Sequence, residues 1–249
     1  MDTQTRHALK QDSFVQATAS SISWLDTHRS TVIRLSIAVV VLLGFFFAGL
    51  IFYNNRTERA ADLFGQAMDI YNTPLAQPGQ PTEPGLKTYA SAAERAKAAN
   101  PLFQEVADKY GWLKQGANAR YLAGMTALDM GQTSAGESDL KKAADSSDSN
   151  VAALAKVALA GLYHQSGRDS QAIELYQQLI AKPTATVPAS LAKLQLAGLY
   201  ESTKPDEAKK LYAEIKDQDK TTAAGQIAAQ KLQGATQVPG PVPGPAPAR

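Results

Sequence analysis

The sequence predicts an all-α protein with a single N-terminal transmembrane helix followed by an α-solenoid of helical repeats. Three observations carry this prediction. An uncharged apolar run lies near the N-terminus, alanine is the commonest residue and favours helix, and apolar residues beyond the run recur at helical spacing without strand alternation. The 249 residues are also enough to bury a sizeable core.

The apolar run extends from Leu35 to Tyr53 and contains no charge and one weakly polar residue, Ser36. A helix of this length covers roughly 28 Å, close to the hydrocarbon thickness of a bilayer. A core helix of a soluble protein rarely runs so far without a charge. The long segment that precedes the run, and the lack of a small-residue cleavage site after it, argue against a cleaved signal peptide. We therefore predict an uncleaved signal anchor over residues 35–55.

Residues 1–34 form the N-terminal tail, which we expect to be cytoplasmic and partly amphipathic. Lys and Arg are about evenly distributed on the two sides of the span, so charge alone does not orient it. The tail is short and slightly basic, and large C-terminal domains translocate largely regardless of charge, which favours an N-inside orientation. The apolar stripe of Phe14, Thr18, Ile22 and Leu25 either lies on the inner leaflet or belongs to a loose amphipathic tail.

A repeated motif is clearest between Ala153 and Pro183. It has the order large–small, aromatic, glycine, alanine, aromatic and proline, which is the tetratricopeptide pattern, and its members are Leu159, Ala160, Tyr163, Gly167, Ala172, Tyr176 and Pro183. The small residues allow two helices to cross closely, the tyrosines fill the space between helices, and the glycine ends the first helix in a left-handed cap.

Two further units share this register, and the three repeats lie near residues 117–148, 153–184 and 190–217. The later unit keeps its small residues and tyrosines, whereas the earlier one keeps the register and loses the aromatic residues. Another alanine-rich array of helical hairpins is the alternative. The similar spacings from Gly124 to Ala160 and from Ala160 to Ala197, 36 and 37 residues, favour the tetratricopeptide class.

The rest of the repeat domain, predicted over residues 56–237, contains three more helical stretches. Thr57 to Tyr71 is amphipathic, Leu86 to Tyr110 is interrupted at Pro101, and a closing helix covers residues 221–233. The segment 72–85 between the first two holds four prolines and is predicted to be a loop. The Pro/Gly-rich tail at 238–249 is predicted to be extended and disordered.

The composition excludes several classes of chemistry. The absence of cysteine excludes a disulfide framework, a thiol nucleophile and a zinc–thiolate site. A net charge of +2 argues against nucleic-acid binding, which leaves a concentrated basic footprint. No phosphate-binding glycine loop, HExxH or GxSxG motif is present. We therefore expect no enzyme activity, no catalytic residue, no cofactor and no metal.

The remaining candidate site is the concave face of the solenoid, which is the usual binding surface of such arrays. Each residue of this face, taken alone, is typical of an ordinary solvated position on a helix. The face as a whole is expected to bind a peptide or a protein. If the register holds, its residues are Asn118, Tyr121, Met125, Asp129, His164, Gln165 and Glu201.

The layout resembles a known family. A tail that carries Leu-Lys-x-Asp-x-Phe between Leu9 and Phe14 leads into one span and then directly into tetratricopeptide helices. This is similar to the YfgM-type ancillary subunits of the SecYEG translocon, whose repeat domain is related to that of CpoB-type division coordinators. The resemblance implies a bacterial inner-membrane protein with a periplasmic repeat domain that links the translocon exit to periplasmic chaperones. A structural homo-oligomer in envelope assembly or cell division is the alternative.

Overall fold

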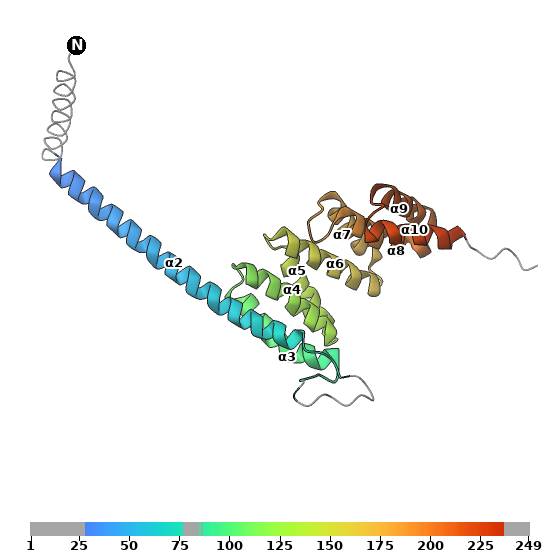
Figure 1. Cartoon of the computed structure of the whole chain (residues 1–249), viewed down its shortest axis with the longest axis horizontal. Coiled ribbons are helices and arrows are strands. Elements are labelled where there is room, and N and C mark those ends of the chain that lie inside the picture. The colour runs from blue at the N-terminus through green and yellow to red at the C-terminus, as the bar shows by residue number, and fades with distance from the viewer. Residues whose placement is uncertain (1–27, 77–84, 86, 237–249) are drawn as a thin grey trace, which may run out of the picture. The chain divides into compact units, whose positions relative to one another are not determined.

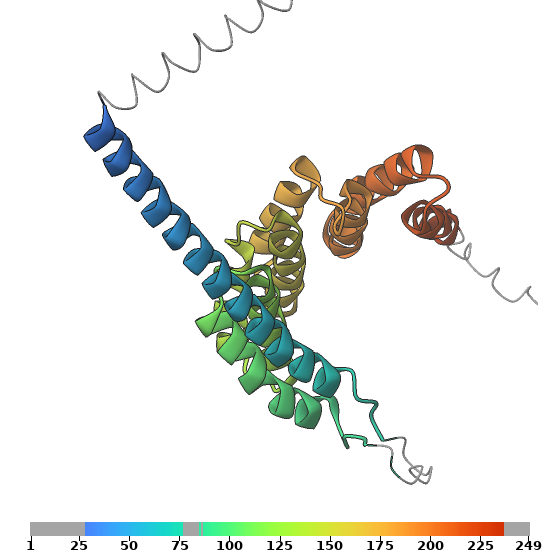
Figure 2. The ribbon, with the colours of Figure 1, turned by 60° about the vertical axis from the view of Figure 1, so that its left-hand side comes forward.

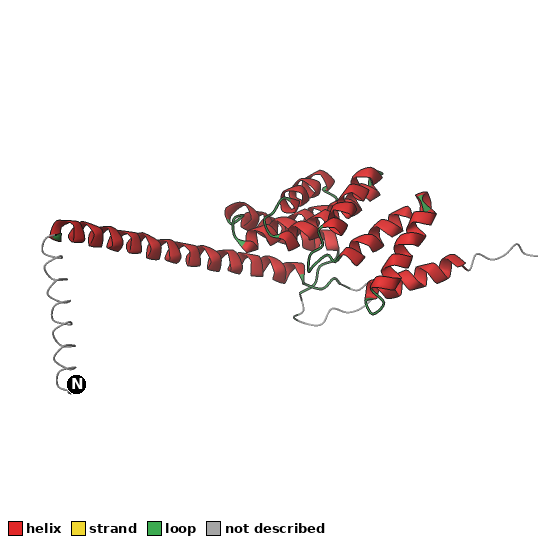
Figure 3. Ribbon diagram, turned by 90° about the horizontal axis from the view of Figure 1, so that it is seen from above, coloured by secondary structure: helices red, strands yellow, loops and turns green. Residues whose placement is uncertain are grey.

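The computed structural model describes residues 28–76, 85 and 87–236, so the predicted N-terminal tail, much of the proline-rich loop and the C-terminal tail lie outside it. In this part of the chain all regular structure is helical, apart from one isolated bridge between Leu75 and Tyr89 (Figure 3). The all-α prediction is confirmed. The helices are α2 (Arg29–Tyr71), α3 (Ala92–Lys109), α4 (Lys114–Asp129), α5 (Thr133–Ala144), α6 (Ser149–Gln165), α7 (Asp169–Ala181), α8 (Ala189–Thr203), α9 (Pro205–Gln218) and α10 (Ala223–Thr236).

The chain divides into two compact units, residues 1–58 and 59–249. The described part of the first unit is the N-terminal portion of α2, which contains the apolar run. Every residue from Leu35 to Tyr53 is exposed. Among the described residues, α2 is the one helix that is long and apolar enough to cross a membrane.

The second unit begins with the last turns of α2, which pack on α3. Ala60 and Ala67 are fully buried and belong to the same cluster as Ala99 and Phe103. The ring of Phe103 makes edge contacts with Phe64, at 5.8 Å between centroids, and with Tyr71, at 6.0 Å. The small residues let the helices approach, and the aromatic rings fill the volume between them.

Helix α3 differs from the predicted stretch in two ways: it does not begin at Leu86, and it is not interrupted at Pro101. It begins at Ala92, because the Ser91 hydroxyl accepts from the Glu94 amide at 3.1 Å while the Glu94 carboxylate accepts from the Ala90 amide at 2.9 Å. This reciprocal pair satisfies amides that the first turn leaves open. The helix then continues through Pro101 without a break. The predicted interruption is wrong, because packing of the Phe103 face outweighs the loss of one backbone hydrogen bond.

The following helices form antiparallel pairs, α4 with α5, α6 with α7, and α8 with α9, and α10 covers the last pair. Each helix packs against its neighbours in the chain, and the succession can be followed in Figures 1 and 2. One buried cluster runs through these pairs, with Ala160 and Ala172 fully buried and Tyr176 almost so. The close crossing that the alanines predict is therefore present.

Two glycines, Gly167 and Gly131, each end the first helix of a pair. The sequence predicts this role for Gly167. Gly167 has a φ of +72°, and its amide donates to His164 O while the next amide donates to Tyr163 O. Gly131 has a φ of +73° and makes the same two bonds one repeat earlier. This is the Schellman cap, in which a Cβ would be strained. The last pair lacks it, because Pro205 starts α9 one residue after α8 ends.

The crossing of α4 and α5 in the first repeat is close although the aromatic residues of the repeat motif are missing there. A Cβ on Gly124 would lie 2.8 Å from Leu140 Cγ, and one on Gly136 would lie 2.5 Å from Leu128 Cδ2. Both distances are shorter than a carbon–carbon contact allows. The glycines occupy the register positions at which the second repeat has Ala160 and Ala172, so the α4–α5 crossing leaves no room even for a methyl group.

A buried polar network ties this repeat to α3. The Asp139 carboxylate is almost fully buried and accepts from the Arg120 guanidinium at 3.1 Å and from the Gln104 amide. Arg120 also pairs with Asp108. A buried carboxylate is stable only when it is paired and hydrogen-bonded, and here the partners come from α3 and α4 while Asp139 lies on α5.

Candidate functional site

The first helices of the pairs carry the face that a solenoid uses for binding. Besides their neighbours in the chain, α4 contacts α6 and α8 contacts α10. The surfaces of α4 and α6 are therefore adjacent. The predicted site residues fall on α4, on α6 and on α8.

The four predicted residues of α4 lie along one side of that helix. Tyr121 and Met125 are half-buried and pack on the main core cluster. Asn118 is also half-buried, and its amide donates to Lys114 O at 3.0 Å within the helix. Asp129, the last residue of α4, is exposed. Tyr121 and Asp129 thus leave a phenol and a carboxylate at the surface.

The α4 group extends onto α2 and α3 through residues that the sequence did not single out as site residues. The Arg95 guanidinium lies 5.2 Å from the centre of the Tyr71 ring, and its Nη1 donates to Thr73 O at 3.1 Å. Arg95 Nε is buried and has no hydrogen-bond partner among the described residues. We refer to Tyr71, Arg95, Tyr121 and Asp129 as the α2–α4 cluster.

The members of the α2–α4 cluster affect one another's pKa. Burial raises the pKa of the Asp129 carboxyl, and the charge on Arg95 opposes that rise. Burial also raises the pKa of the Tyr71 phenol, and the charge on Asp129 raises it further. Burial likewise raises the pKa of the Tyr121 phenol, and the Tyr71 phenol raises it further. The cluster therefore combines a cation, a carboxylate and two neutral phenols.

His164 and Gln165 lie elsewhere, at the C-terminal end of α6. The His164 Nδ1 is 2.7 Å from the Asp169 carboxylate, across the turn that Gly167 makes. His164, Gln165 and Asp169 all retain solvent exposure. This pair joins the end of one helix to the start of the next, and it is not part of the α2–α4 cluster.

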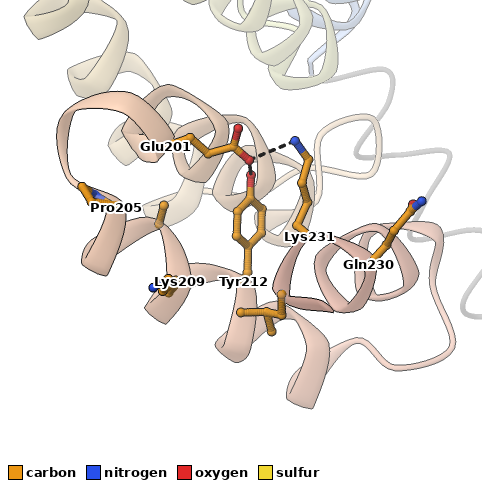
Figure 4. Close-up of a pocket in the computed structure, with 8 residues that line it drawn as sticks. Glu201, Pro205, Lys209, Tyr212, Gln230 and Lys231 are labelled. Atoms are coloured by element: carbon orange, nitrogen blue, oxygen red, sulfur yellow. Dashed lines mark hydrogen bonds and ion pairs between the residues drawn. The ribbon is translucent and has the colours of Figure 1, made fainter. Parts of the chain in front are cut away.

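Glu201 lies at a third place, near the end of α8, and is engaged by two other helices. Its carboxylate accepts from the Tyr212 hydroxyl at 2.7 Å and from Lys231 Nζ at 2.9 Å (Figure 4). The Tyr212 hydrogen bond, followed by that of Lys231, holds the pKa of Glu201 below its usual value. Burial and the same carboxylate raise the pKa of Tyr212. These contacts fasten the closing helix α10 to the last repeat.

A pocket of about 540 Å³ opens beside Glu201, as Figure 4 shows. Pro205, Ala208 and Leu232 supply its apolar lining, and Lys209 and Gln230 add polar groups. Glu201, Tyr212 and Lys231 also line it, and the Glu201 carboxylate already binds the other two. The pocket therefore has an apolar wall and a satisfied polar edge, which suits an aliphatic or aromatic side chain of a partner better than a charged ligand.

Among the described residues there is no group of three His, Asp or Glu side chains arranged to hold a metal ion. Side chains of the second unit instead pair locally to fix one helix to the next. The site offers an open surface that combines half-buried phenols, a thioether and charged groups on α2, α3 and α4. Such a surface binds by contact and hydrogen bonding.

Antiparallel helix pairs with small residues at their crossings, glycine caps between the helices and a closing helix define an α-helical repeat scaffold. Folds of this class are typically non-enzymatic and mediate protein–protein interactions. The tetratricopeptide repeat-like domain family matches residues 23–237, and the chain belongs to that family. The match begins before the apolar run and so includes it together with the repeats. No curated protein matches the chain, and no solved structure does.

Proposed function

We propose that the protein is a membrane-anchored scaffold for protein–protein interactions, held by residues 35–55 as an uncleaved signal anchor. The observation that carries the proposal is the complete exposure of the apolar run from Leu35 to Tyr53 within a continuous helix. A core helix of a soluble protein would be covered on at least one face. The same helix enters the repeat core at Ala60, so the chain has no long linker between span and repeats.

We also propose a compartment and a class of partner. The tail, residues 1–34, faces the cytoplasm of a bacterial cell, and the repeat domain, residues 56–237, lies in the periplasm on the inner membrane. Translocon subunits and periplasmic chaperones are the proposed partners. The support is the resemblance to YfgM-type subunits in the tail motif between Leu9 and Phe14 and in the order of span and repeats.

The proposed contact surface is the face of the first helices, centred on the α2–α4 cluster. Tyr121 and Tyr71 supply rigid amphipathic rings, which suit protein interfaces because few rotors are frozen on binding. Arg95 and Asp129 provide charges of both signs, so the surface can recognise an extended peptide backbone and a polar side chain together.

Protease treatment of spheroplasts tests the anchor and the orientation. With the proposed topology, protease added outside digests residues 56–237 and leaves the span and the tail with the membrane fraction. Digestion of the tail alone would reverse the orientation. Release of the intact chain by alkaline carbonate would contradict the anchor itself.

Site-specific photocrosslinking tests the contact surface. A benzoylphenylalanine at Asp129, exposed on α4, is expected to form adducts with translocon subunits or periplasmic chaperones in intact cells. The matched control places the same group at Gln177, exposed on the second helix α7. Equal adduct yields at the two positions would contradict a surface on the first helices. Adducts of Asp129 with a second copy alone would favour the structural homo-oligomer instead.

A further inference from the structure

The turn between α3 and α4 holds the most exposed large apolar side chain of the described second unit. Trp112 is 59% exposed, compared with 42% for Ile227 and 39% for Leu75. Its neighbours in the turn, Tyr110 and Leu113, are each only 5% exposed and belong to the α2–α3 core. The turn is therefore pinned on both sides of Trp112, so the indole is held at the surface by a fixed backbone rather than by a loose loop.

This turn lies at the end of the second unit where the chain enters from the apolar run. Near the start of α3, Arg95 contacts Tyr71 at the end of α2, and further along α3 Phe103 contacts Phe64. Helix α3 therefore runs antiparallel to the last turns of α2 and returns the chain towards Ala60. The turn that follows α3 shares one buried cluster with Ala60.

Chain length keeps this end of the unit close to the bilayer. The apolar run ends at Tyr53, and the segment from there to Ala60 covers at most about 25 Å even if fully extended. This short segment therefore allows the Trp112 turn to reach the membrane surface. No comparable limit applies to Ile227, which lies on the closing helix α10 at the other end of the array.

The chemistry of the turn suits a lipid interface. Indole places an apolar ring and an N–H donor at the depth where headgroups meet acyl chains, and tryptophan is enriched there. Lys109 and Lys114 flank the turn, are exposed, and have aliphatic stems long enough to reach headgroups. Glu105 pairs with Lys109, and Asp108 pairs with Arg120, so the local charge is balanced. The attraction therefore rests on the indole and does not require anionic lipid.

We propose that Trp112 inserts into the phospholipid headgroup region of the bilayer that holds α2, so that the α3–α4 turn makes a second contact between the protein and the membrane. This inference rests on the membrane anchor proposed above. Its partner is the lipid interface itself, and the contact is independent of which protein the repeats bind.

The test uses fluorescence of the full chain reconstituted into phosphatidylcholine vesicles. The chain has two tryptophans, so Trp24→Phe leaves Trp112 as the single reporter. Vesicles contain lipids brominated either near the carbonyl end or near the methyl end of the acyl chains. The matched control carries Trp24→Phe, Trp112→Phe and Ile227→Trp, which moves the reporter to a similarly exposed position on α10.

The expected result is a loss of Trp112 fluorescence several-fold larger than that of the control, and larger with bromine near the carbonyl end than near the methyl end. A loss no larger than that of the Ile227→Trp control would overturn the proposal, as would stronger quenching by the deeper bromine. Flotation of the vesicles separates the two proposals. Protein that fails to float with lipid contradicts the anchor, whereas protein that floats with unquenched Trp112 contradicts this contact alone.

Discussion

Removing the charge of Glu137 tests how the first and second repeats are joined. The Glu137 carboxylate on α5 accepts two bonds from the Arg168 guanidinium, at 2.8 and 3.0 Å, and pairs with Lys141 at 2.7 Å. The Arg168 guanidinium also stacks 4.2 Å from the centre of the Tyr163 ring. The hydrogen bonds from Arg168, and then those from Lys141, lower the pKa of Glu137 from 4.5 to about 2.

The magnitude follows from that pKa. A fall from 4.5 to about 2 is equivalent to roughly 3 kcal/mol of preference for the charged form. The Glu137 side chain is 17% exposed and its partner Arg168 35%, so solvent screening reduces the expected contribution to about 1–2 kcal/mol. Because the folded-state pKa is depressed, this stability is present above the unfolded pKa and is lost as the pH falls towards 2.

The assay is urea unfolding of the full chain in detergent, followed by circular dichroism over a series of pH values. We expect Glu137→Gln to lower the free energy of unfolding by about 1–2 kcal/mol near neutral pH. The difference from the parent chain should vanish in acid, where the parent carboxyl is also neutral. The control, Glu105→Gln, removes an exposed pair with Lys109 and should change stability by less than about 0.5 kcal/mol. If Glu137→Gln lowers the free energy of unfolding by the same amount at every pH, the loss does not come from the charge of Glu137, and the prediction is wrong.

Four substitutions test the packing, each by urea unfolding. Gly136→Ala should destabilise the fold by about 1–2 kcal/mol, because its Cβ would lie 2.5 Å from Leu128 Cδ2. Its control is Gly161→Ala on α6, where nothing lies within 4 Å of the added Cβ. This change should stabilise the fold by about 0.5–1 kcal/mol. Equal effects of the two would exclude close crossing in the first repeat. Gly167→Ala should cost about 1 kcal/mol, because φ is +72°, and no cost would contradict the left-handed cap. Phe103→Ala should cost about 3–5 kcal/mol, because a fully buried ring leaves a cavity, and a cost below about 1 kcal/mol would show that α2 does not pack there.

Local patterns in the sequence predicted the helices and their crossings. The alanines at Ala160 and Ala172 and the cap at Gly167 depend on neighbours within one hairpin, and all three have the predicted roles. The error at Pro101 has a different origin. The intrinsic cost of a proline in a helix is local, whereas the packing that offsets it comes from α2, across a proline-rich loop.

The site residues were less predictable because their partners lie far away in the chain. Glu201 reads as a solvated helical position, yet it binds Lys231 on the closing helix. Arg95 has no motif that marks it, and its link to Thr73 depends on where the proline-rich loop returns the chain. Periodicity identifies the face of a helix on which a residue lies, and it does not identify the side chain that a later helix places opposite.

The first repeat looked degenerate because its aromatic residues are missing, but its packing suggests a different solution to the same crossing. The register position that holds Tyr176 in the second repeat holds Leu140 in the first, and the small residue opposite changes from Ala160 to Gly124. The two helices are in close contact at this crossing, because a methyl on Gly124 would overlap Leu140. Close packing is kept at the crossing although both facing side chains are smaller. A repeat of this family can therefore lose every aromatic marker and keep its fold, provided that both facing positions change together.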